Sequence, residues 1–145
     1  MKTSAIRLGA TGALLVGMAG CGGGGGYGGS SGSPGTDPNP PMTATFASIQ
    51  SHVFTPICSA CHAGAAAPQG LKLDVANSYM MLVNVASAEV PSIKRVAPGD
   101  AANSYIVQKL EGHAAVGARM PFGGPYLDAT TIGLIRQWID NGAAQ

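Results

Sequence analysis

Apolar residues recur at steps of three and four in two segments, one in the middle of the chain and one near its C-terminus. Residues 43–56 are predicted to form a first helix and residues 128–141 a last one. Asp128 stands where a helix N-cap is expected, and Gly142 stands where a helix stops. The apolar positions of the two predicted faces are Phe46, Ile49 and Val53, and Ile132, Ile135, Trp138 and Ile139.

Two shorter helices are predicted between them. Residues 77–83 form a short apolar segment. After a turn at 96–100, Asn103 is predicted to cap a helix that runs through Leu110 and places Tyr105, Ile106 and Leu110 inward. No run of residues alternates between polar and apolar as a half-buried strand does. The pattern therefore predicts an all-α fold of three to five helices over residues 43–145.

Residues 1–20 have the layout of a secretory signal peptide. Lys2 and Arg7 form a positive start, and an uncharged apolar stretch too short to span a bilayer follows. The segment ends Met18-Ala19-Gly20-Cys21, which resembles the lipobox of bacterial lipoproteins, whose cysteine is lipidated and becomes the new N-terminus. The alternative is an ordinary signal peptide cut nearby, which would leave Cys21 as a free thiol.

Residues 21–42 are rich in Gly, Ser, Pro, Asn and Asp. Such a tract cannot bury enough apolar surface to offset its backbone entropy, so it is predicted to be a flexible linker. Its root-mean-square reach would be roughly 25 Å.

The net charge of the chain argues against a nucleic-acid partner. The chain has 8 Lys and Arg against 7 Asp and Glu, and loss of residues 1–20 removes two of the basic ones, so the mature protein is close to neutral. It has no basic patch that would neutralise a nucleic-acid backbone.

The chain has 3 cysteines, too few for a disulfide-stapled secreted domain. We expect a monomer that does not bind nucleic acid.

The sequence Cys58-Ser59-Ala60-Cys61-His62 is a C-x-x-C-H motif, which is typical of covalent haem attachment. Cysteines three apart on a helical turn lie on one face, where they can form thioethers with the two vinyl groups of one porphyrin. His62 follows Cys58 by four residues and shares that face, so its imidazole is expected to bind the iron as proximal ligand. We therefore expect one covalently bound haem c per chain.

Two other roles for the cysteine pair stay open. A redox-active disulfide between Cys58 and Cys61 would leave His62 without a role, and no βαβ pattern surrounds the pair. A structural zinc site needs four ligands, and the sequence has no second C-x-x-C and no H-x-x-x-H.

Met120 is the candidate for the second axial ligand of the iron. It lies in residues 117–125, a non-helical loop restricted by two prolines, in which glycines allow a close approach to a flat ring. His113, just before this loop, is the alternative and would give bis-histidine ligation. The other possible iron ligands are predicted to have no part in haem binding. His52 is expected at the surface, and Met80 and Met81 are expected in the core.

Two arginines frame the predicted haem pocket. Arg95 and Arg119 lie in or beside turns, and a guanidinium offers a forked donor set that suits a haem propionate. Arg119 stands next to Met120, so we expect Arg119 to bind a propionate. For Arg95, a solvated surface position is the alternative.

These motifs resemble a class I cytochrome c domain, in particular the planctomycete-type variety. The likeness covers the chain from about residue 43 to its end. It implies a first and a last helix that cross beside one haem, with His62 as proximal and Met120 as distal ligand. The signal and linker are not implied by this family. The matching stretches are residues 58–62, 70–74, 97–100, 103–105, 119–124 and 135–143.

A Met/His pair fills both axial positions of the iron and leaves no site for a substrate. We therefore expect an electron carrier, not an enzyme. It would move single electrons between donor and acceptor redox proteins on the periplasmic side of the bacterial cell envelope, anchored to a membrane by lipid. Two other classes stay open: a haem sensor or open-site enzyme such as a peroxidase, and a docking domain for a periplasmic enzyme.

Replacement of the predicted lipidation site tests the anchor. Each methylene of an acyl chain buried in the bilayer adds about 0.8 kcal/mol, so a diacylated protein stays on the membrane. We expect Cys21→Ser to move the protein from the membrane to the soluble fraction, while Ser30→Ala in the linker leaves it bound. An intact mass of the mature wild-type protein without acyl groups would contradict the prediction.

Overall fold

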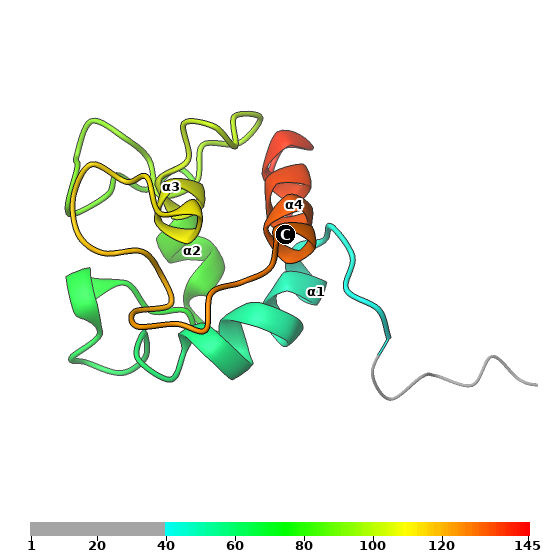
Figure 1. The fold of residues 1–145 in the computed structure, drawn as a ribbon, viewed down its shortest axis with the longest axis horizontal. Helices are drawn as coiled ribbons and strands as arrows, with labels where there is room; N and C mark the ends of the chain where they lie inside the picture. Colours follow the sequence, from blue (N-terminus) through cyan, green and yellow to red (C-terminus); the bar gives the residue numbers. More distant parts are fainter. Residues whose placement is uncertain (1–39) are drawn as a thin grey trace, which may run out of the picture. The chain divides into compact units, whose positions relative to one another are not determined.

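The computed structural model describes residues 40–145, which form helices joined by irregular segments without a strand in this part of the chain. This confirms the predicted all-α class. In chain order the elements are α1 (Phe46–Ile49), a π-helical segment η1 (Gln50–Cys58), a 3-10 turn η2 (Pro68–Gly70), α2 (Ser78–Leu82), α3 (Tyr105–Glu111) and α4 (Ala129–Asp140), as Figure 1 shows.

The predicted signal peptide, the predicted lipid site at Cys21 and most of the predicted linker lie outside the described residues. The last linker residues are already packed. Met42 lies against the hydrophobic core, and the carbonyl oxygen of Pro40 is 2.9 Å from Nε2 of His52. The packed part of the chain therefore begins before residue 43, where the sequence placed its start.

The first helical segment begins and ends later in the chain than the predicted residues 43–56. It begins after Thr45, whose side chain accepts a hydrogen bond from the Ser48 amide, and α1 runs directly into η1. Pro56 was expected to end the helix, yet η1 continues to Cys58. The Ser59 amide donates to the carbonyl of Phe54 (2.8 Å), five residues back, so the wider π turn closes across Pro56 without the N–H that proline lacks.

An aromatic cluster joins the first and last helices. The ring of Phe46 on α1 lies 5.6 Å from that of Trp138 on α4 and 5.0 Å from that of Tyr79 on α2, the latter edge-on. All seven apolar residues of the two predicted helical faces are buried, as the 3.6-residue period predicts. Figure 1 shows α4 beside the start of α1.

The middle helices begin close to the predicted positions. The prediction that Asn103 caps α3 is wrong: the N-cap is Ser104, and the Asn103 side chain donates instead to the Asp100 carboxylate (2.7 Å) in the preceding turn. Asp128 caps α4 as predicted, through a hydrogen bond from the Thr131 amide to its carboxylate (2.9 Å).

One buried polar side chain links three segments. The Gln50 amide group donates to the carbonyl of Leu73 (3.0 Å), and its oxygen accepts a hydrogen bond from the Ser78 hydroxyl at the start of α2. Within residues 40–145 every buried side-chain nitrogen and oxygen has a hydrogen-bond partner.

The helices in residues 40–145 include no candidate for a membrane-spanning segment, which would have to be both longer and more apolar.

Candidate functional site

The C-x-x-C-H motif forms a turn at the end of η1. The carbonyl of Cys58 accepts hydrogen bonds from the amides of Cys61 (3.2 Å) and His62 (2.9 Å). The second of these is a helical i to i+4 bond, so Cys58 and His62 lie one helical turn apart, as the spacing predicts. Cys58 is half-buried, Cys61 is exposed, and both thiols are free.

The segment after the motif fixes the ring of His62. Nδ1 lies 3.1 Å from the carbonyl oxygen of Leu71, and the Leu73 amide donates to the carbonyl of His62 (2.7 Å). A carbonyl oxygen can only accept a hydrogen bond, so Nδ1 carries the proton. Nε2 of the neutral ring is then the nitrogen with a free lone pair, which is the form that binds a metal.

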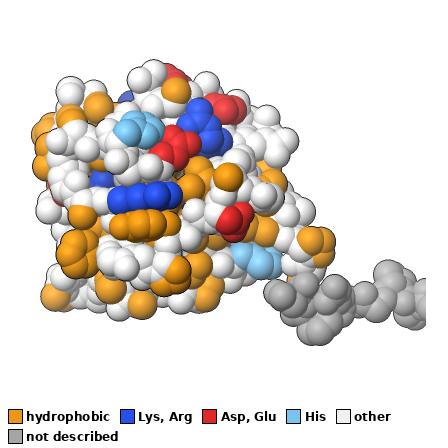
Figure 2. All heavy atoms as spheres, in the orientation of Figure 1, with side chains coloured by type: hydrophobic (Ala, Val, Ile, Leu, Met, Phe, Trp, Pro, Cys, Tyr) orange, Lys and Arg blue, Asp and Glu red, His pale blue; other side chains and the backbone are white. Residues whose placement is uncertain are grey.

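A cavity of about 1120 Å³ lies beside the motif. Pockets for small ligands have volumes of about 300–1,000 Å³, so this one is large enough for a large flat cofactor. Figure 2 shows hydrophobic side chains gathered over the lower part of one face of the molecule. Residues that line the cavity include Cys58, Cys61, His62 and Met120, and the apolar Phe54, Leu71, Leu73, Ile106, Leu110 and Leu127.

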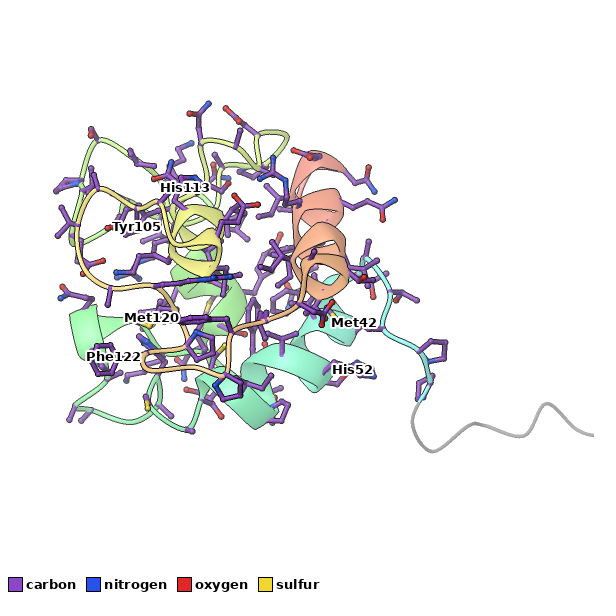
Figure 3. The ribbon with its side chains drawn as sticks, in the orientation of Figure 1. Met42, His52, Tyr105, His113, Met120 and Phe122 are labelled. Carbon is purple, nitrogen blue, oxygen red and sulfur yellow. The ribbon has the colours of Figure 1, made fainter. Side chains whose placement is uncertain are left out.

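Met120 reaches this cavity from the loop between α3 and α4. Its amide donates to the carbonyl of Lys109 near the end of α3 (2.9 Å), and its side chain is half-buried against the core. Figure 3 shows Met120 and Phe122 on the loop, with His113 beside α3 and well apart from Met120. The structure therefore brings Met120, and not His113, to the same cavity as His62.

The alternative histidines have other partners. His113 is exposed, with Nδ1 3.6 Å from the carboxylate of Glu111. His52 was expected at the surface; it is half-buried at the edge of the cavity, and both of its ring nitrogens lie 2.9 Å from backbone carbonyl oxygens.

The prediction that Met80 fills the core is wrong. Its side chain is 71% exposed, because α2 buries Ser78 and Leu82, one turn apart, and Met80 falls on the opposite face. Met81 is half-buried, and its sulfur accepts a hydrogen bond from the Lys72 amide (3.3 Å).

The two arginines differ in position. Arg95 lines the cavity, donates to the carbonyls of Met81 and Gln69 (2.9 Å each), and has its pKa lowered by burial. Arg119 is not among the lining residues, and its Nε donates to the carbonyl of Leu110 (2.8 Å). A contact of Arg119 with a propionate stays a prediction.

A polar cluster at the cavity was not found from the sequence. The Glu89 carboxylate accepts hydrogen bonds from Lys109 Nζ (2.9 Å) and the Tyr105 hydroxyl (3.0 Å), and the same two donors reach the carbonyl of Val116. Burial raises the pKa of Glu89, but the hydrogen bonds from Lys109 and Tyr105 and the Lys109 charge outweigh this effect and hold the pKa below its usual value. Glu89 lies in an irregular segment, where no periodic pattern marks it.

The environment of the Cys58 thiol argues against the two other roles considered for Cys58 and Cys61, a redox-active disulfide and a zinc site. Burial raises the pKa of the Cys58 thiol to about 11, so it is protonated at neutral pH. Disulfide exchange and zinc binding both use the thiolate, which burial disfavours at Cys58. Within residues 40–145 no three His, Cys, Asp or Glu side chains come close enough together to hold a metal ion by themselves.

Comparisons of the chain with models of protein families, with curated proteins and with solved structures give no match. We therefore infer function from the residues and their geometry.

The ion pair of Glu89 makes stability depend on pH. Because the folded-state pKa of Glu89 lies below its unfolded value of about 4.3, the pair stabilises the fold above that pH, and this stabilisation is lost as the pH falls through the folded-state pKa. We expect Glu89→Gln to lower the free energy of unfolding at about pH 7 by no more than about 1 kcal/mol.

Urea titrations at several pH values measure this effect. The difference between Glu89→Gln and wild type should shrink as the pH falls below about 4. The control is Glu111→Gln, which breaks the more exposed pair with Arg136 (3.1 Å) and should change stability less. A Glu89→Gln difference that stays constant down to the lowest pH would contradict the prediction.

Proposed function

We propose that residues 40–145 form a mono-haem c-type cytochrome domain with the class I fold, which carries single electrons between redox proteins. Cys58 and Cys61 would hold haem c through two thioethers, and His62 and Met120 would be its axial ligands. In this proposal the protein is an electron carrier and has no substrate site.

The observation that supports the proposal is that these four side chains, from two segments about sixty residues apart, line one apolar cavity of about 1120 Å³. The residues fit the cofactor in three respects. The cavity volume suits a large flat group. The two thiols are free, and the histidine has Nε2 available because Nδ1 is engaged with Leu71.

A bound haem supplies reversible one-electron chemistry at its iron. The chain contributes the surroundings. His62 is held by two backbone contacts, and the backbone of Met120 is held by the end of α3, which would help to keep both ligands in place when the charge of the site changes. The apolar wall formed by Leu71, Ile106 and Leu110 would lie against the haem in place of water, which would limit reorganisation around the transferred electron.

We also propose where the domain works. The predicted signal peptide, lipid anchor at Cys21 and flexible linker would tether it to a membrane on the periplasmic side of the bacterial cell envelope. There it would act as a monomer between a donor and an acceptor protein.

Covalent haem attachment is the first test. Wild-type protein made with a cytochrome c maturation system should carry haem that stays with the polypeptide on a denaturing gel. Cys58→Ala together with Cys61→Ala should abolish this haem stain, whereas Cys21→Ala should keep it. Wild-type protein without covalent haem, or a double variant that still retains it, would overturn the proposal.

Carbon monoxide binding tests the distal ligand. Met120 would bind the iron in both oxidation states, so the reduced wild-type protein should not bind carbon monoxide. Met120→Ala should open that position and lower the midpoint potential, since methionine ligation favours the reduced iron. The exposed Met80 provides the control, because Met80→Ala should behave as wild type.

The same measurements separate the alternatives. A bis-histidine spectrum lost in His113→Ala would pass the ligand role to His113 and leave the carrier function in place. A five-coordinate wild-type protein that binds carbon monoxide or peroxide would move the function to sensing or catalysis. A six-coordinate protein that no redox partner reduces would favour a docking domain.

A further inference from the structure

The end of α3 anchors the loop that carries Met120. The last carbonyls of a helix have no partner within the helix. Here the carbonyl of Lys109 accepts the Met120 amide (2.9 Å), and the carbonyl of Leu110 accepts Nε of Arg119 (2.8 Å). Two adjacent loop residues thus satisfy two adjacent carbonyls at the helix end.

Arg119 also contacts Tyr126, which follows Met120 in the same loop. Its guanidinium carbon lies 4.1 Å from the centre of the Tyr126 ring, a cation–π contact between residues that flank Met120 in sequence. The path of the side chain depends on Gly112, whose φ of +85° suits glycine. A Cβ at position 112 would come within 2.8 Å of Cδ of Arg119.

We propose that Arg119 is a positioning residue for Met120: its guanidinium joins the end of α3 to Tyr126 and so holds the thioether at the cavity. This inference rests on the proposed function. It assigns Arg119 a role through its neighbour, which differs from the predicted contact with a haem propionate.

The role has a measurable consequence. If Arg119 holds the loop closed, its loss raises the fraction of molecules in which Met120 has left the iron. An added ligand that competes for that position binds with an apparent affinity proportional to this fraction. Imidazole is a suitable probe because it is small and binds oxidised haem iron.

The experiment compares four variants of the full-length haem-loaded protein. Tyr126→Ala should bind imidazole about two- to fivefold more tightly than wild type, which corresponds to the loss of one cation–π contact at an exposed ring. Arg119→Gln should bind it at least as tightly as Tyr126→Ala, because it also loses the hydrogen bond to the Leu110 carbonyl. Both should weaken the sulfur-to-iron absorption band of the oxidised protein. Tyr126→Phe keeps the ring and should behave as wild type, and so should Arg136→Gln, which removes an arginine paired with Glu111 instead.

The double variant Arg119→Gln with Tyr126→Ala should bind imidazole about as tightly as Arg119→Gln alone, because Arg119→Gln has already lost the contact with the Tyr126 ring. Tyr126 is 50% exposed, so its replacement tests the role even if Arg119→Gln folds poorly.

Two results would overturn the inference while the proposed function stands. One is imidazole affinity in Arg119→Gln and Tyr126→Ala equal to that of wild type. The other is unchanged imidazole affinity in Arg119→Gln with a midpoint potential that differs from wild type only where propionates titrate, which would return Arg119 to the propionate. Wild-type protein without covalent haem would instead remove the proposed function, and the inference with it.

Discussion

Hydrogen bonds from side chains to backbone carbonyls hold the edge of the cavity in place. Nδ1 of His62 donates to the carbonyl of Leu71. Arg95 donates to the carbonyls of Met81 in α2 and Gln69 in η2, and so joins two segments that are distant in sequence.

The short helices explain why loops matter so much in this fold. Isolated helices of five or seven residues, the lengths of α2 and α3, are not stable in water. They exist because other segments satisfy their ends and bury their faces. The loop after α3 therefore has two roles at once, since the residues that complete the helix also present the thioether of Met120 to the cavity.

The sequence allowed the helices and the C-x-x-C-H turn to be predicted, because both follow from local spacing. The burial of Phe46 and Trp138 follows from a helical period, and the relation of Cys58 to His62 follows from one turn of helix. The cluster of Glu89 and Lys109 could not be predicted, because it joins residues twenty positions apart through an irregular segment. The exposed position of Met80 depends on which face of a five-residue helix packs, which an apolar run does not reveal.

The aromatic rings of Phe46, Tyr79 and Trp138 form a cluster that is not part of the cavity lining. The domain thus contains one region that is densely packed by itself and another whose walls face the cavity. Local opening requires less free energy where fewer apolar contacts must be broken. Backbone amides of α4 beside the cluster should then exchange with solvent hydrogen more slowly than those of the Met120 loop.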